Sequence, residues 1–276
     1  MKFALCNELL REWSFERQVD FASGLGYDGL EIAPFTLADS VLEIPPAERA
    51  RVRGILGEAG LAMPATHWLL VKPEGLHISS PDETLRKRTS DYLAALAHFT
   101  ADLGGSVMIF GSPKQRSLLP EVSLDQAREW SRETLLAALP ACAERGVTLC
   151  IEQLSTAETD FLTTLEEVAE FVDYVDHPNC ALMLDVKAMS SLRVPLPELI
   201  RQYGPRAKHF HANDANLQGP GFGKVDYVPL FRALGEIGYE GWVSVEVFDY
   251  SPGIERLALE SLKYMQKCLE EVATDG

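Results

Sequence analysis

The sequence predicts a single (β/α)8 barrel that spans residues 1–276. Eight apolar runs alternate with helical patterns along the chain, which favours a barrel over an open sheet. Four of these runs end in a residue that can bind a metal ion, namely Glu152, Asp185, His211 and Glu246. They are 33, 26 and 35 residues apart, and each interval fits a strand followed by a helix. Because catalytic residues of such barrels lie at the carboxyl ends of the strands, we expect these four side chains to converge.

The expected strands are short runs of large apolar and β-branched residues, which is typical of strands buried on both faces of a parallel sheet. Turn residues precede two of them, with Gly26-Tyr27-Asp28-Gly29 before the second strand and Gly238-Tyr239-Glu240-Gly241 before the eighth. The expected strands cover residues 2–6, 30–32, 61–66, 106–110, 147–152, 180–185, 208–211 and 242–246.

The helices between these strands are placed by their capping residues. Ser14 and Ser123 are suited to N-caps, the prolines at 45 and 46 suit a first turn, and two glycines at 104 and 105 suit a helix end. The expected helices cover residues 14–24, 45–60, 81–103, 123–144, a segment that ends at 173, and then 197–203, 227–237 and 254–272.

Composition limits the partners of this chain. Its 41 acidic and 25 basic residues give a net charge of −16, which repels polyanions and argues against nucleic acid as a partner. No apolar run approaches the roughly 18 residues needed to span a membrane, so we expect no membrane association. The five cysteines show no CxxC spacing, and this pattern favours a reducing, cytoplasmic location.

Four further residues are candidate substrate-binding residues. His67 and Trp68 close the expected third strand, where their side chains would face the site. Glu158 lies six residues beyond Glu152, where it can reach a substrate hydroxyl or remain an exposed loop carboxylate. Lys187 follows Asp185 closely and is suited either to a substrate oxygen or to a structural ion pair.

Two loops carry further expectations. Residues 69–81 form a long connection for a barrel, and we interpret this loop as a candidate lid over the site. Lys114 and Arg116 follow the fourth strand in a polar loop, where they meet either solvent or an anionic substrate group.

Two Glu, one Asp and one neutral His are ligands suited to Mn²⁺, Mg²⁺ or Co²⁺ and, with tighter geometry, to Zn²⁺. If these four residues served only to stabilise the fold, several buried charges would be left without a compensating partner. A metal-polarised carbonyl makes the neighbouring C–H acidic, and a Glu on each side of a substrate can then remove and return a proton. This set of residues therefore predicts isomerisation, epimerisation or dehydration next to a carbonyl.

The chain resembles the xylose isomerase-like TIM-barrel superfamily, which contains sugar isomerases, ketose 3-epimerases and endonuclease IV. The resemblance covers nearly the whole chain and is carried by five groups of residues: Gly26 to Glu31, Glu152 to Glu158, Leu184-Asp185, His209-Phe210-His211 with Pro220-Gly221-Phe222-Gly223, and Gly238 to Glu246. It implies that Glu152, Asp185, His211 and Glu246 hold one divalent metal, often Mn²⁺, and that Glu152 and Glu246 form the acid/base pair. It also implies that Glu158 contacts the sugar, and a homodimer is compatible with barrels of this group.

The sequence departs from the ketose 3-epimerases at two positions. Ala188 stands where they usually carry a sugar-binding His, and Leu217 stands at the approximate place of their Arg. Endonuclease IV requires further His ligands for three zinc ions, and Ala188, Ser112 and the loop after His211 do not supply them.

We therefore predict a metal-dependent isomerase or epimerase that acts on a small keto-sugar or related polyol, with Glu152 and Glu246 exchanging the proton. The first alternative is a metal-dependent lyase or dehydratase that acts on a keto-inositol, a keto-glycoside or a dehydroshikimate-like compound. The second alternative is a sugar-binding barrel without turnover.

Overall fold

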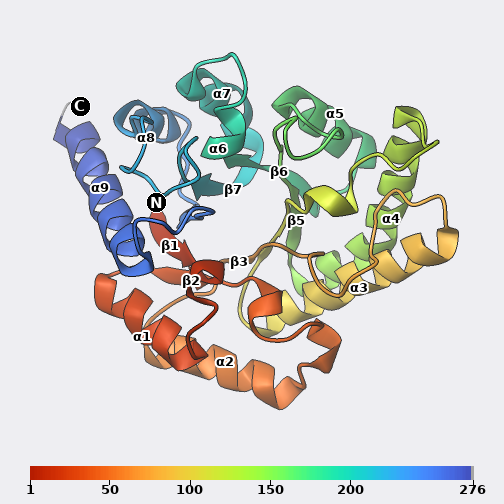
Figure 1. Cartoon of the computed structure of the whole chain (residues 1–276), viewed down its shortest axis with the longest axis horizontal. Coiled ribbons are helices and arrows are strands. Elements are labelled where there is room, and N and C mark those ends of the chain that lie inside the picture. Colours follow the sequence, from red (N-terminus) through yellow and green to blue (C-terminus); the bar gives the residue numbers. More distant parts are fainter. Residues whose placement is uncertain (275–276) are drawn as a thin grey trace.

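The computed structural model describes residues 1–274 and contains one parallel sheet of eight strands in the order β2-β1-β8-β7-β6-β5-β4-β3. Figure 1 shows the helices arranged around these strands. Strands β2 and β3 meet through isolated parallel bridges, Gly29 to Ala62 and Ile32 to Thr66, which bring the two ends of the sheet together. The predicted (β/α)8 barrel is therefore confirmed.

The strands are β1 Lys2–Cys6, β2 Gly29–Glu31, β3 Ala65–Thr66, β4 Val107–Phe110, β5 Thr148–Ile151, β6 Cys180–Asp185, β7 Ala207–Ala212 and β8 Trp242–Val245. The α-helices of the described residues are α1 Phe15–Leu25, α2 Pro46–Glu58, α3 Glu83–Asp102, α4 Leu124–Arg145, α5 Leu165–Val175, α6 Val186–Met189, α7 Leu196–Tyr203, α8 Val228–Glu236 and α9 Ile254–Thr274. Short 3-10 helices span Asn7–Leu10, Pro34–Thr36, Val41–Glu43, Pro113–Gln115 and Gly204–Arg206.

The caps behave largely as their residue types predict. The Ser14 side chain accepts the backbone N–H of Arg17 at the start of α1. Ser123 and Gln126 form a complete capping box at the start of α4, and Gly146 ends that helix in the left-handed conformation.

The third strand differs from its prediction, because pairing within β3 is limited to two residues. Pro64 lies directly before it and lacks the N–H that a longer strand would need.

The barrel interior has an apolar half and a polar half. Strands β3 to β6 fill their half with a small cluster of buried residues: Ala65, Val107, Ile109, Cys150, Ala181 and Met183. On the other half, β2, β7 and β8 place Glu31, His209 and Ser244 inside, all fully buried. Nε2 of His209 lies 3.0 Å from Oγ of Ser244 and 2.8 Å from Oε2 of Glu31. A polar network thus replaces apolar packing in this half of the barrel.

None of the helices among residues 1–274 combines the length and the apolar character that crossing a membrane requires.

Candidate active site

The four residues predicted to bind a metal lie together at the carboxyl ends of neighbouring strands. Asp185 ends β6 and pairs in register with His211 of β7. Glu152 follows β5, and its N–H donates to the carbonyl of Phe110; Glu246 follows β8, and its N–H donates to the carbonyl of Ala212. One ligand atom from each of Glu152, Asp185, His211 and Glu246 lies within 4.8 Å of every other. The predicted convergence is therefore found.

Burial, the neighbouring carboxylates and His211 set the pKa values of the carboxyl groups in this cluster. Burial, together with Asp185 and Glu246, raises the pKa of Glu152 to about 8. Burial also raises the pKa of Asp185. Burial would raise the pKa of Glu246 as well, but the neighbouring His211 outweighs it and lowers this pKa to about 2. Three carboxylates in such proximity favour binding of a cation.

Asp185 is held on both of its carboxylate oxygens. Oδ1 accepts the N–H of Ala188 at 2.6 Å and thereby caps helix α6, while Oδ2 accepts the amide of Asn213 at 2.7 Å. Oδ1 of Asn213 in turn accepts the N–H of Lys187 at 2.6 Å. The side chain of Asp185 is therefore fixed before any ligand binds.

His211 is oriented from below by the carboxylate of Glu31, a residue of β2. Nε2 of His211 lies 3.0 Å from Oε1 of Glu31, whereas Nδ1 lies 3.0 Å from Oε2 of Glu246 and has no hydrogen-bond partner. Burial would raise the pKa of Glu31, but His209 and His211 hold it well below its usual value, so Glu31 is an anion. Burial works against a charged His211, but Glu246 and Glu31 raise its pKa well above the usual value, so without a cation the ring is protonated on both nitrogens. A cation that displaced the proton on Nδ1 would find the other proton held on Nε2 by Glu31 and the lone pair of Nδ1 directed at the cluster.

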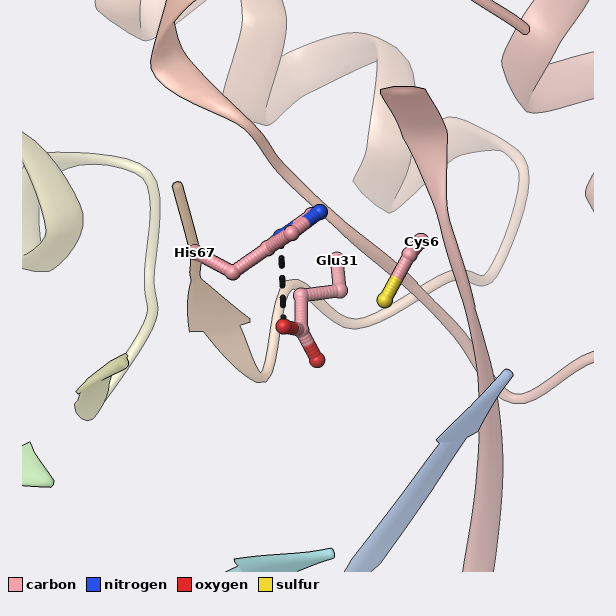
Figure 2. A group of neighbouring side chains, drawn as sticks. All are labelled: Cys6, Glu31 and His67. Carbon is pink, nitrogen blue, oxygen red and sulfur yellow. Dashed lines mark ion pairs between the residues drawn. The ribbon is translucent and has the colours of Figure 1, made fainter. Parts of the chain in front are cut away.

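Figure 2 shows the next layer of this network, in which the ring of His67 faces the carboxylate of Glu31 and the sulfur of Cys6 points toward Glu31. Nδ1 of His67 lies 3.2 Å from Glu31, and Nε2 lies 2.7 Å from Glu8. Burial, with the charge of Glu31, raises the pKa of the Cys6 thiol to about 12. Cys6 therefore stays protonated, and we interpret this second group as a hydrogen-bonded support for His211.

A cavity of about 140 Å³ lies above the cluster, and we call it the catalytic cavity. Glu152 and Glu246 both line it. The four residues predicted to bind substrate line it as well: His67, Trp68, Glu158 and Lys187. Asp185 and His211 do not line the cavity. The two glutamates are therefore the members of the cluster that can reach a bound molecule.

Trp68 closes one wall of the catalytic cavity. Its ring lies near the rings of Phe35 and Phe248, with centroid distances of 6.1 and 6.2 Å. The indole Nε1–H donates to Oε1 of Glu246 at 2.9 Å. Trp68 adopts a φ of 54°, a left-handed conformation that is unfavourable for a large residue and concentrates at functional positions.

Lys187 and Glu158, which also line the catalytic cavity, form an ion pair. Nζ of Lys187 lies 2.7 Å from Oε1 of Glu158 and 4.0 Å from the ring centroid of Phe248. Burial works against a charged Lys187, but Asp185 and Glu152 raise its pKa above the usual value. Burial likewise works against a charged Glu158, and Lys187 overcomes it to lower the Glu158 pKa. Both side chains are therefore charged where they face the cavity.

Two residues that support Glu152 were missed or misplaced from the sequence. A Cβ atom on Gly111 would lie 1.7 Å from Oε2 of Glu152, so only glycine leaves room for this carboxylate. Arg116, expected to meet solvent or an anionic substrate group, is fully buried instead, and its Nη1 donates to the backbone carbonyl of Glu152 at 2.7 Å. Burial lowers the pKa of Arg116 to about 10.

The loop 69–81, expected to be a lid, packs against the body of the barrel over much of its length. The N–H of Ile78 donates to the carbonyl of Gln115, and the hydroxyl of Thr134 donates to the carbonyl of Ile78. Residues 76–80 are buried, and within this loop only Val71 lines the catalytic cavity. The prediction used only the length of this loop, whereas the side chains of Leu76 and Ile78 anchor the loop in the hydrophobic core.

These features define a TIM barrel with a buried carboxylate and imidazole cluster below a small cavity. A sequence model described as "Xylose isomerase-like TIM barrel" matches residues 19–268. The chain belongs to this family.

The relatives of this chain include epimerases of sugars. D-psicose 3-epimerase of Ruminiclostridium cellulolyticum is 28% identical over 250 residues, which cover 86% of this chain and 80% of that protein. A crystal structure of D-psicose 3-epimerase from Clostridium cellulolyticum H10 superposes with a TM-score of 0.86 at 23% identity and covers 98% of this chain and 99% of that one. The structure of 3-keto-D-glucoside 4-epimerase from E. coli gives a TM-score of 0.84 at 19% identity, with 97% and 100% covered. The structural matches establish the fold, and the sequence relatives support the predicted isomerase or epimerase class.

Proposed function

We propose that this protein is a metal-dependent sugar epimerase that moves a proton on the carbon next to the carbonyl of a keto-sugar. The observation that carries the proposal is the convergence of Glu152, Asp185, His211 and Glu246 below a cavity that the two glutamates line. The names of the sequence relatives, which are ketose 3-epimerases, favour the same reaction.

The donor set fits a divalent cation. Nδ1 of His211 and Oε2 of Glu246 are buried atoms without hydrogen-bond partners, and three carboxylates crowd the same point. Oxygen-rich sites with one imidazole favour Mn²⁺, with Mg²⁺, Co²⁺ and Zn²⁺ as other candidates. A cation bound by these four residues supplies Lewis-acid polarisation of the substrate carbonyl, which acidifies the adjacent C–H.

The chain itself supplies the proton transfers. Glu152 follows β5 and Glu246 follows β8, so they flank the cavity from different strands. One glutamate removes the proton from one face of the carbon, and the other returns a proton to the opposite face, which inverts that centre. The indole of Trp68 holds Glu246. We assign the binding of substrate hydroxyl groups to Lys187 and Glu158, and their position in the lining of the cavity supports this role.

The test is solvent-deuterium exchange. The Mn²⁺-loaded protein is incubated with D-psicose, D-fructose or D-tagatose in D₂O, and deuterium at the carbon next to the carbonyl is followed by NMR together with formation of the epimer. We expect exchange and epimerisation in the wild type. Glu152→Gln and Glu246→Gln should keep the circular dichroism spectrum and lose exchange.

Other outcomes separate the alternatives. Loss of water or of an aglycone from a keto-glycoside or keto-inositol would support the lyase, and binding of ketoses without exchange would support the sugar-binding barrel. Full exchange by Glu246→Gln would refute the assigned acid/base pair.

A further inference from the structure

A second cavity adjoins the catalytic cavity at the carboxyl rim, and we call it the distal cavity. It measures about 560 Å³, whereas the catalytic cavity measures about 140 Å³. The two cavities share three lining residues, Glu158, Lys187 and Phe248. A molecule whose reacting carbon lies between Glu152 and Glu246 can therefore extend past these three residues into the distal cavity.

The other residues that line the distal cavity carry no charge. They come from the loop after β5, from the end of α6 and the turn after it, and from the loop after β7: Ser155, Ala157, Ser190, Ser191, Ala215 and Leu217. Lys187 is the one cation among the lining residues, and its Nζ already pairs with Glu158 at 2.7 Å. A phosphate or carboxylate group would meet no free cation here, so the cavity favours a neutral group.

The lining suits a ring that has both polar edges and apolar faces. The hydroxyl of Ser190 donates to the carbonyl of Val186, and that of Ser191 donates to the carbonyl of Ala188, both at 2.6 Å. Each oxygen keeps lone pairs that can accept a hydrogen bond from a ligand hydroxyl. Leu217 is 45% exposed and provides an apolar surface for the face of a ring.

One wall of the distal cavity is fixed before a ligand arrives. The carbonyl of Leu217 accepts two hydrogen bonds, from the N–H of Phe248 at 2.9 Å and from the N–H of Asp249 at 2.8 Å. These bonds tie the loop after β7 to the segment after β8, with Leu217 in a left-handed conformation at a φ of 71°. The cavity therefore requires no large ordering of the chain on binding.

We propose that the distal cavity binds a neutral second ring that is attached to the keto-sugar, so the substrate class is a keto-disaccharide or an aryl glycoside of a keto-sugar. This inference rests on the proposed epimerase activity and specifies its substrate. Contacts to the second ring are remote from the reacting carbon, and they stabilise the bound substrate and its transition state.

The experiment compares substrates with the same reacting end. Deuterium exchange into D-fructose is measured beside exchange into maltulose and isomaltulose, which are disaccharides with a fructose unit. In the same way, exchange into 4-nitrophenyl 3-keto-β-D-glucoside is compared with exchange into methyl 3-keto-β-D-glucoside, which lacks the aryl ring. We expect kcat/KM to be about tenfold or more higher for at least one larger substrate, as remote binding energy predicts.

Variants that fill the distal cavity test its role. Ser191→Trp and Ala215→Trp place an indole in the distal cavity and should lower the kcat/KM ratio of the preferred larger substrate to its smaller counterpart to near one. Thr156→Trp, at an exposed loop residue that lines neither cavity, is the matched control and should keep the wild-type ratio. Equal kcat/KM for large and small substrates, or an unchanged ratio in both filling variants, would overturn the inference.

Failure of the proposed reaction would be recognised separately. If no substrate shows exchange, the epimerase proposal fails, and the distal cavity is tested by calorimetric binding of isomaltulose and 4-nitrophenyl 3-keto-β-D-glucoside. If the wild type binds these two larger ligands more tightly than it binds fructose and methyl 3-keto-β-D-glucoside, and if Ser191→Trp loses this difference, the distal cavity is supported. If the wild type and Ser191→Trp bind the larger ligands with the same affinity, the inference is refuted.

Discussion

Nε2 of His211 lies 3.0 Å from Oε1 of Glu31, and this contact directs Nδ1 of His211 toward Glu246. Glu31 is fully buried and contributes no atom to the four-residue cluster. We predict that Glu31→Gln weakens Mn²⁺ binding by about 10- to 100-fold, the usual effect of losing a carboxylate that orients a metal-binding histidine. Isothermal titration of the metal-free protein with Mn²⁺ measures this effect.

Glu8→Gln is the matched control for that variant. Glu8 is a buried carboxylate of the same network, but it contacts His67 rather than His211. Its loss should change Mn²⁺ affinity less than the loss of Glu31. Equal Mn²⁺ affinity of wild type and a folded Glu31→Gln would show that His211 needs no support from Glu31.

Gly111→Ala is predicted to displace Glu152. The added methyl group would lie 1.7 Å from Oε2 and 2.8 Å from Cδ of Glu152, so the carboxylate must move. We expect the metal content of the purified protein, measured by elemental mass spectrometry, to fall together with deuterium exchange. Gly54→Ala is the control, because Gly54 lies in helix α2 with nothing within 4 Å of the new methyl group, and it should raise stability by up to about 1 kcal/mol.

Removal of the metal is predicted to lower the melting temperature. Without a cation, burial and the neighbouring Asp185 and Glu246 raise the pKa of Glu152 to about 8, and a metal that binds only the folded chain stabilises it by mass action. At 100 times the dissociation constant this gain is about 2.7 kcal/mol, or roughly 5–10 °C for a chain of this size. Calorimetry with chelator and after addition of Mn²⁺ measures the shift, and His211→Ala should show little of it. A melting temperature independent of Mn²⁺ in the wild type would contradict the assigned site.

The fold and the cluster were predictable from the sequence because each of the four residues ends an apolar run. Parallel strands bring their carboxyl ends to one rim, so spacing along the chain is enough to predict that Glu152, Asp185, His211 and Glu246 converge. The substrate-binding roles of the residues that line the catalytic cavity stay predictions.

The residues that hold the four-residue cluster in position could not be predicted from the sequence in the same way. The contact of Glu31 with His211 joins residues 180 positions apart and depends on how the barrel closes. The charge of Arg116 predicts exposure, and only the folded loop shows that its guanidinium lies inside and binds the backbone of Glu152. Gly111 has an ordinary sequence context, and its role follows from the position of a side chain on the neighbouring strand.

We predict that His77 makes the free energy of unfolding depend on pH. Nδ1 of His77 accepts the N–H of Ser79, and Nε2 donates to the carbonyl of Ser117, which together select the neutral ring. Burial, only partly offset by Ser117, lowers the pKa of His77 below its usual value. As the pH falls through about 6.5, the unfolded chain binds a proton that the folded chain does not, so stability decreases until the lowered pKa is passed. Urea unfolding of wild type and His77→Gln between pH 7.5 and pH 5 should show a larger loss for the wild type, and parallel curves would contradict this assignment.

Trp68→Phe is predicted to slow proton transfer while leaving the wall of the catalytic cavity in place. Phenylalanine keeps an aromatic ring near Phe35 and Phe248, but it removes the indole N–H that donates to Oε1 of Glu246 at 2.9 Å. A hydrogen bond to a charged group contributes about 1.5–3 kcal/mol, so we expect kcat for exchange to fall roughly 10- to 100-fold with a smaller change in KM. Steady-state deuterium exchange measures both constants. Trp68→Ala, which also removes the wall, should raise KM in addition, and a rise in KM alone for Trp68→Phe would show that the indole binds substrate and does not position Glu246.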